Sequence, residues 1–217
     1  MLLLVPDGPY LVKGTRFNSK AFATIFRSKD LRSASFGYFG HMWELYTVWA
    51  FIPLLLAHYA AINNQPLNVS WWSFSFIAAG ALGCIAGGFA SKKLGSAAVA
   101  FFQLSSSAIC CLLSPLMFNT PLPVFLAFLI FWGVVVVGDS PQFSALTAQT
   151  APPDLVGSAL TIVTSIGFFI TIISIQFANF LAESIPIQNI FLFLVLGPAI
   201  GLFYLWPLLK DFLKKHI

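Results

Sequence analysis

Charged residues are scarce in this chain: Asp, Glu, Lys and Arg make up 8% of its 217 residues, whereas hydrophobic residues make up 59%. Soluble globular domains carry about 25% charged residues, so this shortage excludes an ordinary soluble domain. The 11 basic residues stand only in the gaps between long apolar runs. This placement argues against a nucleic-acid-binding surface and, with a mean hydropathy of +0.89, predicts an integral protein of the lipid bilayer.

Cysteine and histidine are also few. Cys84, Cys110 and Cys111 all fall inside apolar runs, and the adjacent pair has the wrong geometry for an ordinary disulfide. We interpret them as small packing residues. His41 and Glu44 are three residues apart, but a catalytic metal usually needs three protein ligands, so we expect neither a metal site nor a cofactor.

Motifs for catalysis and for targeting are missing. The chain has no GxSxG nucleophile elbow, no HExxH and no cluster of three or more acids, so we expect it not to be an enzyme. The apolar start Met1 to Val5 is too short for a signal peptide and lacks a basic flank. We therefore expect no cleaved targeting segment.

Six apolar runs are each long enough to cross a membrane, since a hydrocarbon core of about 30 Å takes about 20 helical residues. The fold class predicted is an all-α membrane protein, a bundle over residues 33–217. Residues 1–32 are predicted to be a basic cytoplasmic connector, whose opening Leu2 to Val5 resembles the end of an absent upstream helix. The six predicted spans cover residues 33–60, 71–90, 96–117, 122–148, 155–182 and 187–209.

The basic residues also predict the orientation of the bundle, because Lys and Arg in short loops stay on the cytoplasmic side. Six precede the first span, Lys92 and Lys93 follow the second, and three follow the sixth. The loops 61–70, 118–121 and 183–186 contain none. With six spans, all the basic positions fall on one face, so both termini are predicted to be cytoplasmic.

The first span carries Glu44 near its middle, where a carboxylate is costly and implies a partner, a water-filled cavity or a proton. Small, polar and aromatic residues recur there at spacings of three and four and share one helical face with Glu44. These residues are Gly37, Gly40, His41, Glu44, Thr47 and Phe51. That face is expected to point toward protein or water.

A second acid, Asp139, interrupts the fourth span in the segment Gly138 to Gln142. Pro141 removes a backbone donor, so we expect a helix break at which Asp139 or Ser140 accepts freed N–H groups. Counted at about 1.5 Å per residue, Glu44 and Asp139 lie at similar depths, about 16 and 15 Å from the cytoplasmic end.

Small residues mark two further spans. Gly80, Gly83 and Gly87 in the second span allow close helix approach in lipid. The fifth span presents a stripe of small and hydroxyl residues, which either bond across helices, line a path or simply pack. This stripe consists of Gly157, Thr161, Thr164, Gly167, Thr171 and Ser174. The third and sixth spans are expected to face lipid.

The connection GFASKKLG between the second and third spans resembles the glycine-rich basic loop motif of the major facilitator superfamily. Gly88, Lys93 and Gly95 match that motif, whereas Lys92 stands where the family has an acid. With the basic connector and six spans, the chain resembles the C-terminal six-helix half of such a transporter. The segments PDGP, GYFGHMWELY and GDSPQFSALTAQTAP resemble bacterial members near the nitrate and cyanate porters. The second span lacks the arginine expected of nitrate porters, which argues against nitrate.

This resemblance implies that the spans are helices seven to twelve of twelve, arranged as a 3+3 inverted repeat in the inner membrane. The first and fourth would then line a central path and the third and sixth would face lipid. The second and fifth would meet a missing N-terminal six-helix half or, in its place, a second copy of the chain.

We therefore predict secondary active transport of a small solute by alternating access, coupled to protons or by uniport. The predicted pathway residues are Glu44, His41, Asp139, Trp43, Tyr46, Thr164 and Thr171. Glu44 is interpreted as the titrating group, the alternative being a structural carboxylate bonded to His41 or to a hydroxyl. For Asp139 the structural role at the proline break is favoured. The alternatives to transport are a non-transporting fragment or packing subunit and, more weakly, an intramembrane enzyme.

Overall fold

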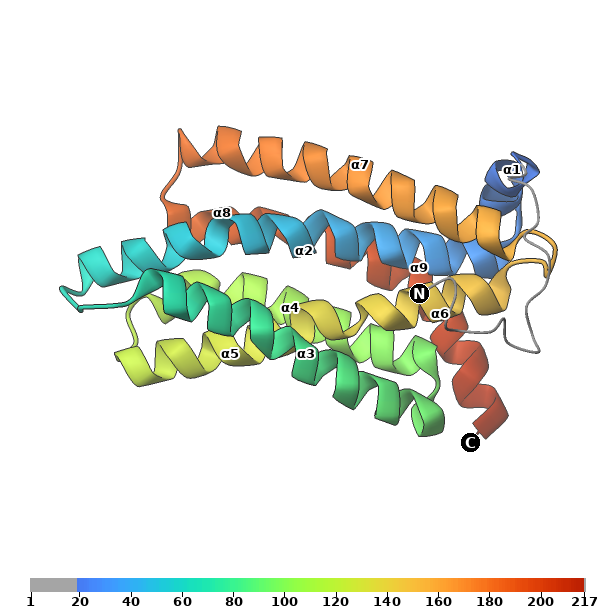
Figure 1. The fold of residues 1–217 in the computed structure, drawn as a ribbon, viewed down its shortest axis with the longest axis horizontal. Coiled ribbons are helices and arrows are strands. Elements are labelled where there is room, and N and C mark those ends of the chain that lie inside the picture. Colours follow the sequence, from blue (N-terminus) through green and yellow to red (C-terminus); the bar gives the residue numbers. More distant parts are fainter. Residues whose placement is uncertain (1–18, 217) are drawn as a thin grey trace, which may run out of the picture.

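The computed structural model describes residues 19–216, which form nine α-helices and no strand (Figure 1). The predicted helix remnant Leu2 to Val5 and the basic residues Lys13 and Arg16 lie outside the described residues. The helices are α1 (Lys20–Arg27), α2 (Lys29–Ile62), α3 (Val69–Leu94), α4 (Ser96–Met117), α5 (Leu122–Gly138), α6 (Ser140–Thr150), α7 (Val156–Ala182), α8 (Ile187–Leu194) and α9 (Leu196–His216).

Six helical segments are long and apolar enough to cross a membrane, which confirms the predicted number of spans. Four of them are the single helices α2, α3, α4 and α7, and the other two are the pairs α5–α6 and α8–α9. The first span begins earlier than predicted because the Ser28 hydroxyl accepts the N–H of Leu31. In the same way, Asn68 caps α3 by accepting the N–H of Trp71 at 3.0 Å. Polar caps thus extend the helices beyond their apolar runs.

Two spans are interrupted near a proline. The break between α5 and α6 falls at Asp139, two residues before Pro141, as the sequence predicts. The break between α8 and α9 falls at Val195, before Gly197-Pro198. Proline has no N–H to donate to the preceding turn, which explains why both helices end just upstream.

The packing of the helices is reciprocal between the first three spans and the last three. The first helix of the first set, α2, packs against α7 and α9 of the second set. Conversely α5, which opens the second set, packs against α3 and α4 of the first. Consecutive spans run in opposite directions, so α2 and α5 are antiparallel equivalents. This exchange is the arrangement that a 3+3 inverted repeat requires.

Glycines allow the closest of these contacts. A Cβ built on Gly83 of α3 would lie 1.9 Å from the carbonyl oxygen of Val134 on α5, and one on Gly133 would lie 2.2 Å from that of Phe76. A Cβ on Gly40 of α2 would lie 2.3 Å from the carbonyl oxygen of Gly197 on α9. The α3–α5 and α2–α9 backbones therefore touch directly, as small residues permit in a bundle surrounded by lipid.

Hydroxyl groups on the predicted stripe of α7 bind the backbone of α2. Ser174 donates to the carbonyl oxygen of Trp43 at 2.5 Å and accepts from the hydroxyl of Thr47 at 2.8 Å. Thr171 donates to the carbonyl oxygen of Met42 at 3.1 Å. The sequence left open whether this stripe bonds across helices, lines a path or simply packs. Thr171 and Ser174 bond across helices.

We expect Ser174→Ala to destabilise the bundle by about 1 kcal/mol, since interhelical hydrogen bonds in membranes contribute about 0.6 and at most about 1.7 kcal/mol. Thr161→Ala is the control, because that hydroxyl bonds only to Gly157 of its own helix and is exposed. Unfolding of both variants in detergent, followed by circular dichroism, should separate them. Equal losses would contradict a role for the α2–α7 bonds.

Two apolar clusters fill the bundle, one toward each end. One cluster surrounds Trp132, Tyr59 and Phe125, and the other surrounds Phe143, Leu104 and similar residues. In the first cluster, Tyr59 stacks on Phe125 with ring centroids 3.8 Å apart. The buried polar side chains His41, Glu44, Thr47, Ser107, Asp139 and Ser174 lie between these clusters at mid-length of the spans.

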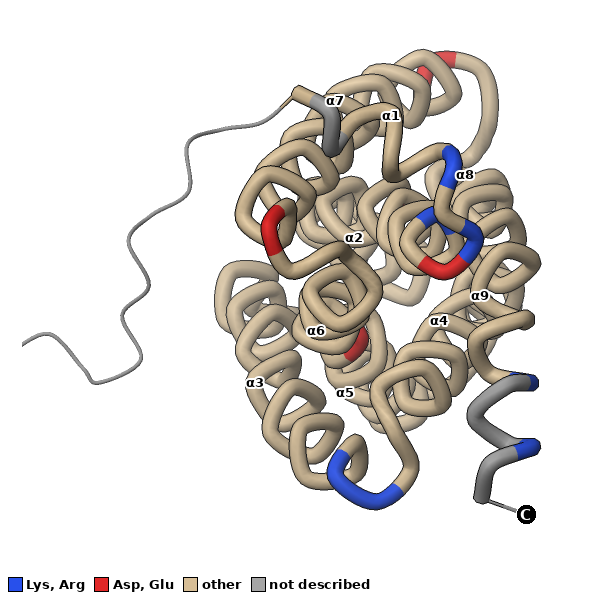
Figure 2. Tube along the Cα trace, turned by 90° about the vertical axis from the view of Figure 1, so that its right-hand side faces the viewer, with Lys and Arg blue, Asp and Glu red and all other residues tan. Residues whose placement is uncertain are grey.

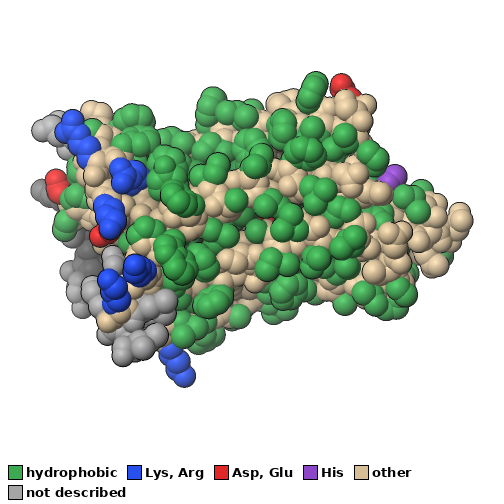
Figure 3. All heavy atoms as spheres, turned by 180° about the vertical axis from the view of Figure 1, so that it is seen from behind, with side chains coloured by type: hydrophobic (Ala, Val, Ile, Leu, Met, Phe, Trp, Pro, Cys, Tyr) green, Lys and Arg blue, Asp and Glu red, His purple; other side chains and the backbone are tan. Residues whose placement is uncertain are grey.

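Basic residues gather at one end of the bundle (Figures 2 and 3), and hydrophobic side chains cover the wall between the two ends in the view of Figure 3. These basic residues come from the connection at Lys92 and Lys93, from the start of α2 and from the end of α9. The placement agrees with the charge pattern that the six-span count predicts.

The positive-inside rule gives a direct test of orientation. Single cysteines replacing Asn64 and Lys92 should react with a membrane-impermeant maleimide from opposite sides of sealed vesicles. The test is made in a Cys84→Ser background, because Cys84 is partly exposed whereas the other two cysteines are buried. Labelling of both positions from the same side would contradict the six-span topology.

Candidate functional site

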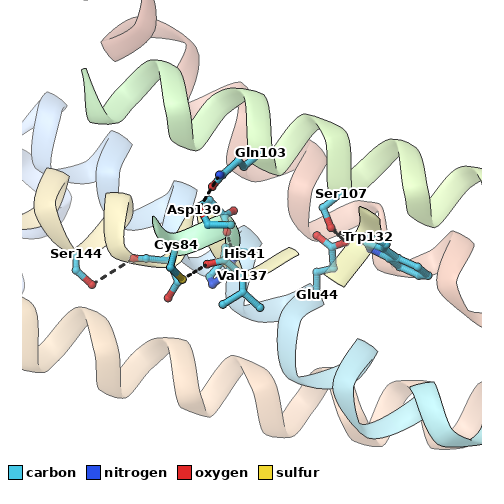
Figure 4. Close-up of polar contacts among 11 residues, drawn as sticks. His41, Glu44, Cys84, Gln103, Ser107, Trp132, Val137, Asp139 and Ser144 are labelled. Carbon is cyan, nitrogen blue, oxygen red and sulfur yellow. Dashed lines mark hydrogen bonds and ion pairs between the residues drawn. The ribbon is translucent and has the colours of Figure 1, made fainter. Parts of the chain in front are cut away.

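The buried polar layer at mid-bundle is the candidate site. It brings together side chains from α2, α4 and the α5–α6 break (Figure 4). Glu44, His41 and Asp139 are each only 1% exposed. A carboxylate so deep in a membrane-spanning bundle is costly unless it is paired, hydrogen-bonded or neutral, so the partners of each acid decide its role.

His41 of α2 and Asp139 at the α5–α6 break point toward one another (Figure 4). Nδ1 of His41 lies 3.0 Å from Oδ1 of Asp139, an ion-pair distance when the histidine is protonated. Nε2 of His41 lacks a hydrogen-bond partner among the described residues, and the Asp139 carboxylate lies beside the His41 ring and the backbone N–H groups of Asp139 and Ser140. Among the described side chains, His41 is therefore the ion-pair partner of Asp139.

The Asp139 side chain does not make the capping hydrogen bond that we predicted for Asp139 or Ser140. Asp139 occupies the N-cap position of α6 but makes no side-chain capping hydrogen bond. Its backbone carbonyl instead accepts the N–H groups of Gln142 and Phe143, at 2.9 and 3.0 Å. The backbone thus satisfies the start of α6 and leaves the carboxylate to face His41.

Glu44 lies in a different environment, between α2 and α4. Its Oε1 accepts the hydroxyl of Ser107 at 2.5 Å and the thiol of Cys111 at 3.1 Å. The indole N–H of Trp132 on α5 in turn donates to the Ser107 hydroxyl at 3.1 Å (Figure 4). Three helices hold this carboxyl in place, which matches the structural alternative in which Glu44 bonds to a hydroxyl.

Gln103 of α4 lies against the α5–α6 break. Its amide nitrogen donates to the carbonyl oxygen of Gly83 at 3.4 Å, while its amide oxygen is buried without a hydrogen-bond partner among the described residues. A Cβ on Gly138 would lie 2.6 Å from that amide group. The glycine before Asp139 therefore makes room for a polar side chain beside the break.

The other predicted pathway residues lie away from these acids. Trp43 packs against Phe177, and Tyr46 packs against Phe168, so both point toward α7 rather than toward α4. Thr164 is exposed on α7, whereas Thr171 is buried against α2. These four residues thus form no single site with Glu44.

The predicted loop motif connects α3 and α4. Gly95 has a φ of 75°, a left-handed conformation that favours glycine, and ends α3. Lys92 lies over the ring of Phe89 at 5.2 Å, and Gly88 faces open space. Neither Lys92 nor Lys93 forms an ion pair with an acid whose side chain the structure describes. The motif is therefore a turn whose two lysines form no ion pair with a described acid.

We did not predict that Ser107 and Cys111 contact Glu44, or that Trp132 contacts Ser107. Gln103, Ser107, Cys111 and Ser114 recur at spacings of four, four and three along α4, so helical periodicity could have indicated an inward polar stripe. Trp132 gives no such signal, because α5 is hydrophobic on all sides.

Metal chemistry has no support in this layer. No group of three or more His, Cys, Asp or Glu side chains among the described residues is arranged to hold a metal ion. The groups present can instead bind, release or share protons, since a histidine and two carboxyls lie within one buried layer.

The comparisons with known proteins gave one result. The family model described as Major Facilitator Superfamily matches residues 34–216, which include most of the first span and all of the other five. Neither the curated proteins nor the solved structures gave a match.

Proposed function

Because the chain belongs to the Major Facilitator Superfamily, a family of membrane transporters, we propose that it carries a small solute across the membrane by alternating access, coupled to protons. The observation that carries the proposal is the match over six apolar helices with a buried, titratable layer between them. We place it in the inner membrane, and the basic end of the bundle supports cytoplasmic termini.

We propose that the His41–Asp139 pair couples transport to protons. The sequence analysis gave this role to Glu44. Hydrogen bonds from Ser107 and Cys111 fix Glu44, whereas the side-chain partner of the Asp139 carboxylate is the imidazole ring of His41. His41 and Asp139 also belong to different helices, joined across a helix break. Protonation of Asp139 would weaken its attraction to His41 and so change how α2 and α6 meet.

The fold supports the proposal that the chain acts as one half of a twelve-helix transporter. The least buried spans are α3 and α7, the two expected to meet the other half of such a transporter. A second set of six helices, in the same polypeptide or a second copy, would complete the central path. A packing subunit without transport is the alternative.

Reconstituted vesicles test the proposal. Vesicles carrying the chain, with a pH dye inside, should show proton flux on addition of one of a panel of small organic acids, amines or sugars. Empty vesicles are the control. If no panel member moves protons while chemical cross-linking shows a stable complex with another membrane protein, the packing-subunit alternative is favoured.

A further inference from the structure

A groove at the basic end of the bundle runs between the start of α2 and the outer face of α9. Its volume is about 570 Å³. Its lining combines the two cations Lys29 and Arg32 with the aromatic rings of Phe101, Tyr204 and Trp206 and an apolar part that includes Leu202. The groove takes no part in the His41–Asp139 site, because none of its residues belongs to that layer.

The cations of this groove have no acidic partner among the side chains that the structure describes. Neither Lys29 nor Arg32 forms an ion pair with them, and no described acid lines the groove. Arg32 donates to the carbonyl oxygen of Phe26 at 3.2 Å, which holds its guanidinium in place and leaves other N–H donors available. An anionic group that is planar or tetrahedral, such as a phosphate, fits these donors.

Aromatic residues indicate the level in the membrane at which the groove lies. Tyr204 stacks on Phe36 with ring centroids 4.4 Å apart. Trp206 is 52% exposed and packs against Phe101, with ring centroids 5.7 Å apart. Tyr and Trp at the end of a span are typical of the level of lipid headgroups. The cations thus lie where the phosphates of a bilayer lie.

Below the cations the groove becomes apolar. Phe203, 75% exposed, and Leu202 lie about two helical turns from Lys210, the end of the last span. From Trp206 to Ala199 the α9 wall extends about 10 Å at about 1.5 Å per residue, enough for the first part of an acyl chain. A water-soluble anion would leave this apolar part of the groove unfilled.

We propose that this groove binds an anionic phospholipid of the surrounding bilayer, with its phosphate on Lys29 and Arg32 and an acyl chain against Leu202 and Phe203. Basic pockets between spans on the cytoplasmic side are suited to such headgroups. Charge complementarity and depth together select a lipid as the occupant rather than a soluble phosphate.

Lipid binding by the full chain, purified in non-ionic detergent, tests this proposal by native mass spectrometry. Dioleoyl phosphatidylglycerol should bind, and dioleoyl phosphatidylcholine should bind much more weakly. The double variant Lys29→Gln/Arg32→Gln should bind phosphatidylglycerol about 30-fold more weakly, since each cation near a lipid surface contributes about 1 kcal/mol. The control Lys92→Gln/Lys93→Gln removes the same charge at the same end of the bundle but outside the groove, and should bind like the wild type.

Three results would overturn the proposal. These are equal losses of phosphatidylglycerol binding in the two double variants, equal binding of both lipids, or competition by glycerol phosphate as strong as by phosphatidylglycerol. If the Lys29/Arg32 variant does not fold, Phe203→Ala replaces it, because that exposed side chain supports no core packing. It should weaken binding of the dioleoyl lipid but not of its dihexanoyl analogue. Neither readout depends on transport.

Discussion

Replacing Gly83 by valine is expected to destabilise the bundle by about 3 kcal/mol or more, the upper part of the range for overpacked interiors. A Cβ at this position would lie 1.9 Å from the carbonyl oxygen of Val134 and 2.9 Å from its carbonyl carbon. These are backbone atoms, so no side chain can rotate to relieve the contact. The helices α3 and α5 would have to separate along an interface that holds α3 in the bundle.

Gly88→Val is the matched control for this prediction. Gly88 lies on the same helix, but a Cβ built there meets no atom within 4 Å. Both variants gain the same side chain in the same helix, so differences in helix propensity cancel. Chemical denaturation in mixed micelles measures the two free energies of unfolding. Comparable losses would show that α3 and α5 do not touch as closely as the structure has them.

The number and order of the spans could be predicted because each needs only length and apolar composition. The break before Pro141 was also predictable, since a missing N–H has a local effect on its own helix. The exact starts were not, because the caps at Ser28 and Asn68 lie outside the apolar runs that define a span. Apolar length therefore locates a helix, and polar chemistry at its ends decides where it begins.

The candidate site was predictable only as a list of residues. Helical spacing places His41 and Glu44 on one face of the same helix and allows a bond between them, yet His41 pairs with Asp139 instead. Glu44 bonds to Ser107 and Cys111 on a helix that we expected to face lipid. Such pairings depend on how distant helices rotate against one another, and one sequence carries no measure of that rotation.

Asp139→Asn is expected to abolish proton-driven accumulation of the solute while leaving downhill exchange intact. One proton moving down one pH unit supplies about 1.4 kcal/mol, enough for about a tenfold solute gradient. The amide cannot titrate, so this gradient should disappear and uptake should end at equal concentrations on both sides. Vesicles with an imposed pH gradient, loaded with the solute that the panel identifies, measure both quantities.

Glu44→Gln is the matched comparison, because it also replaces a buried carboxyl by an amide of similar size in the same layer. Its amide oxygen can still accept from Ser107 and Cys111, so accumulation should persist. His41→Gln should behave like Asp139→Asn, since the proposed coupling needs both groups. The reverse pattern, with accumulation lost in Glu44→Gln and kept in Asp139→Asn, would return the coupling role to Glu44 and make Asp139 a structural residue of the helix break.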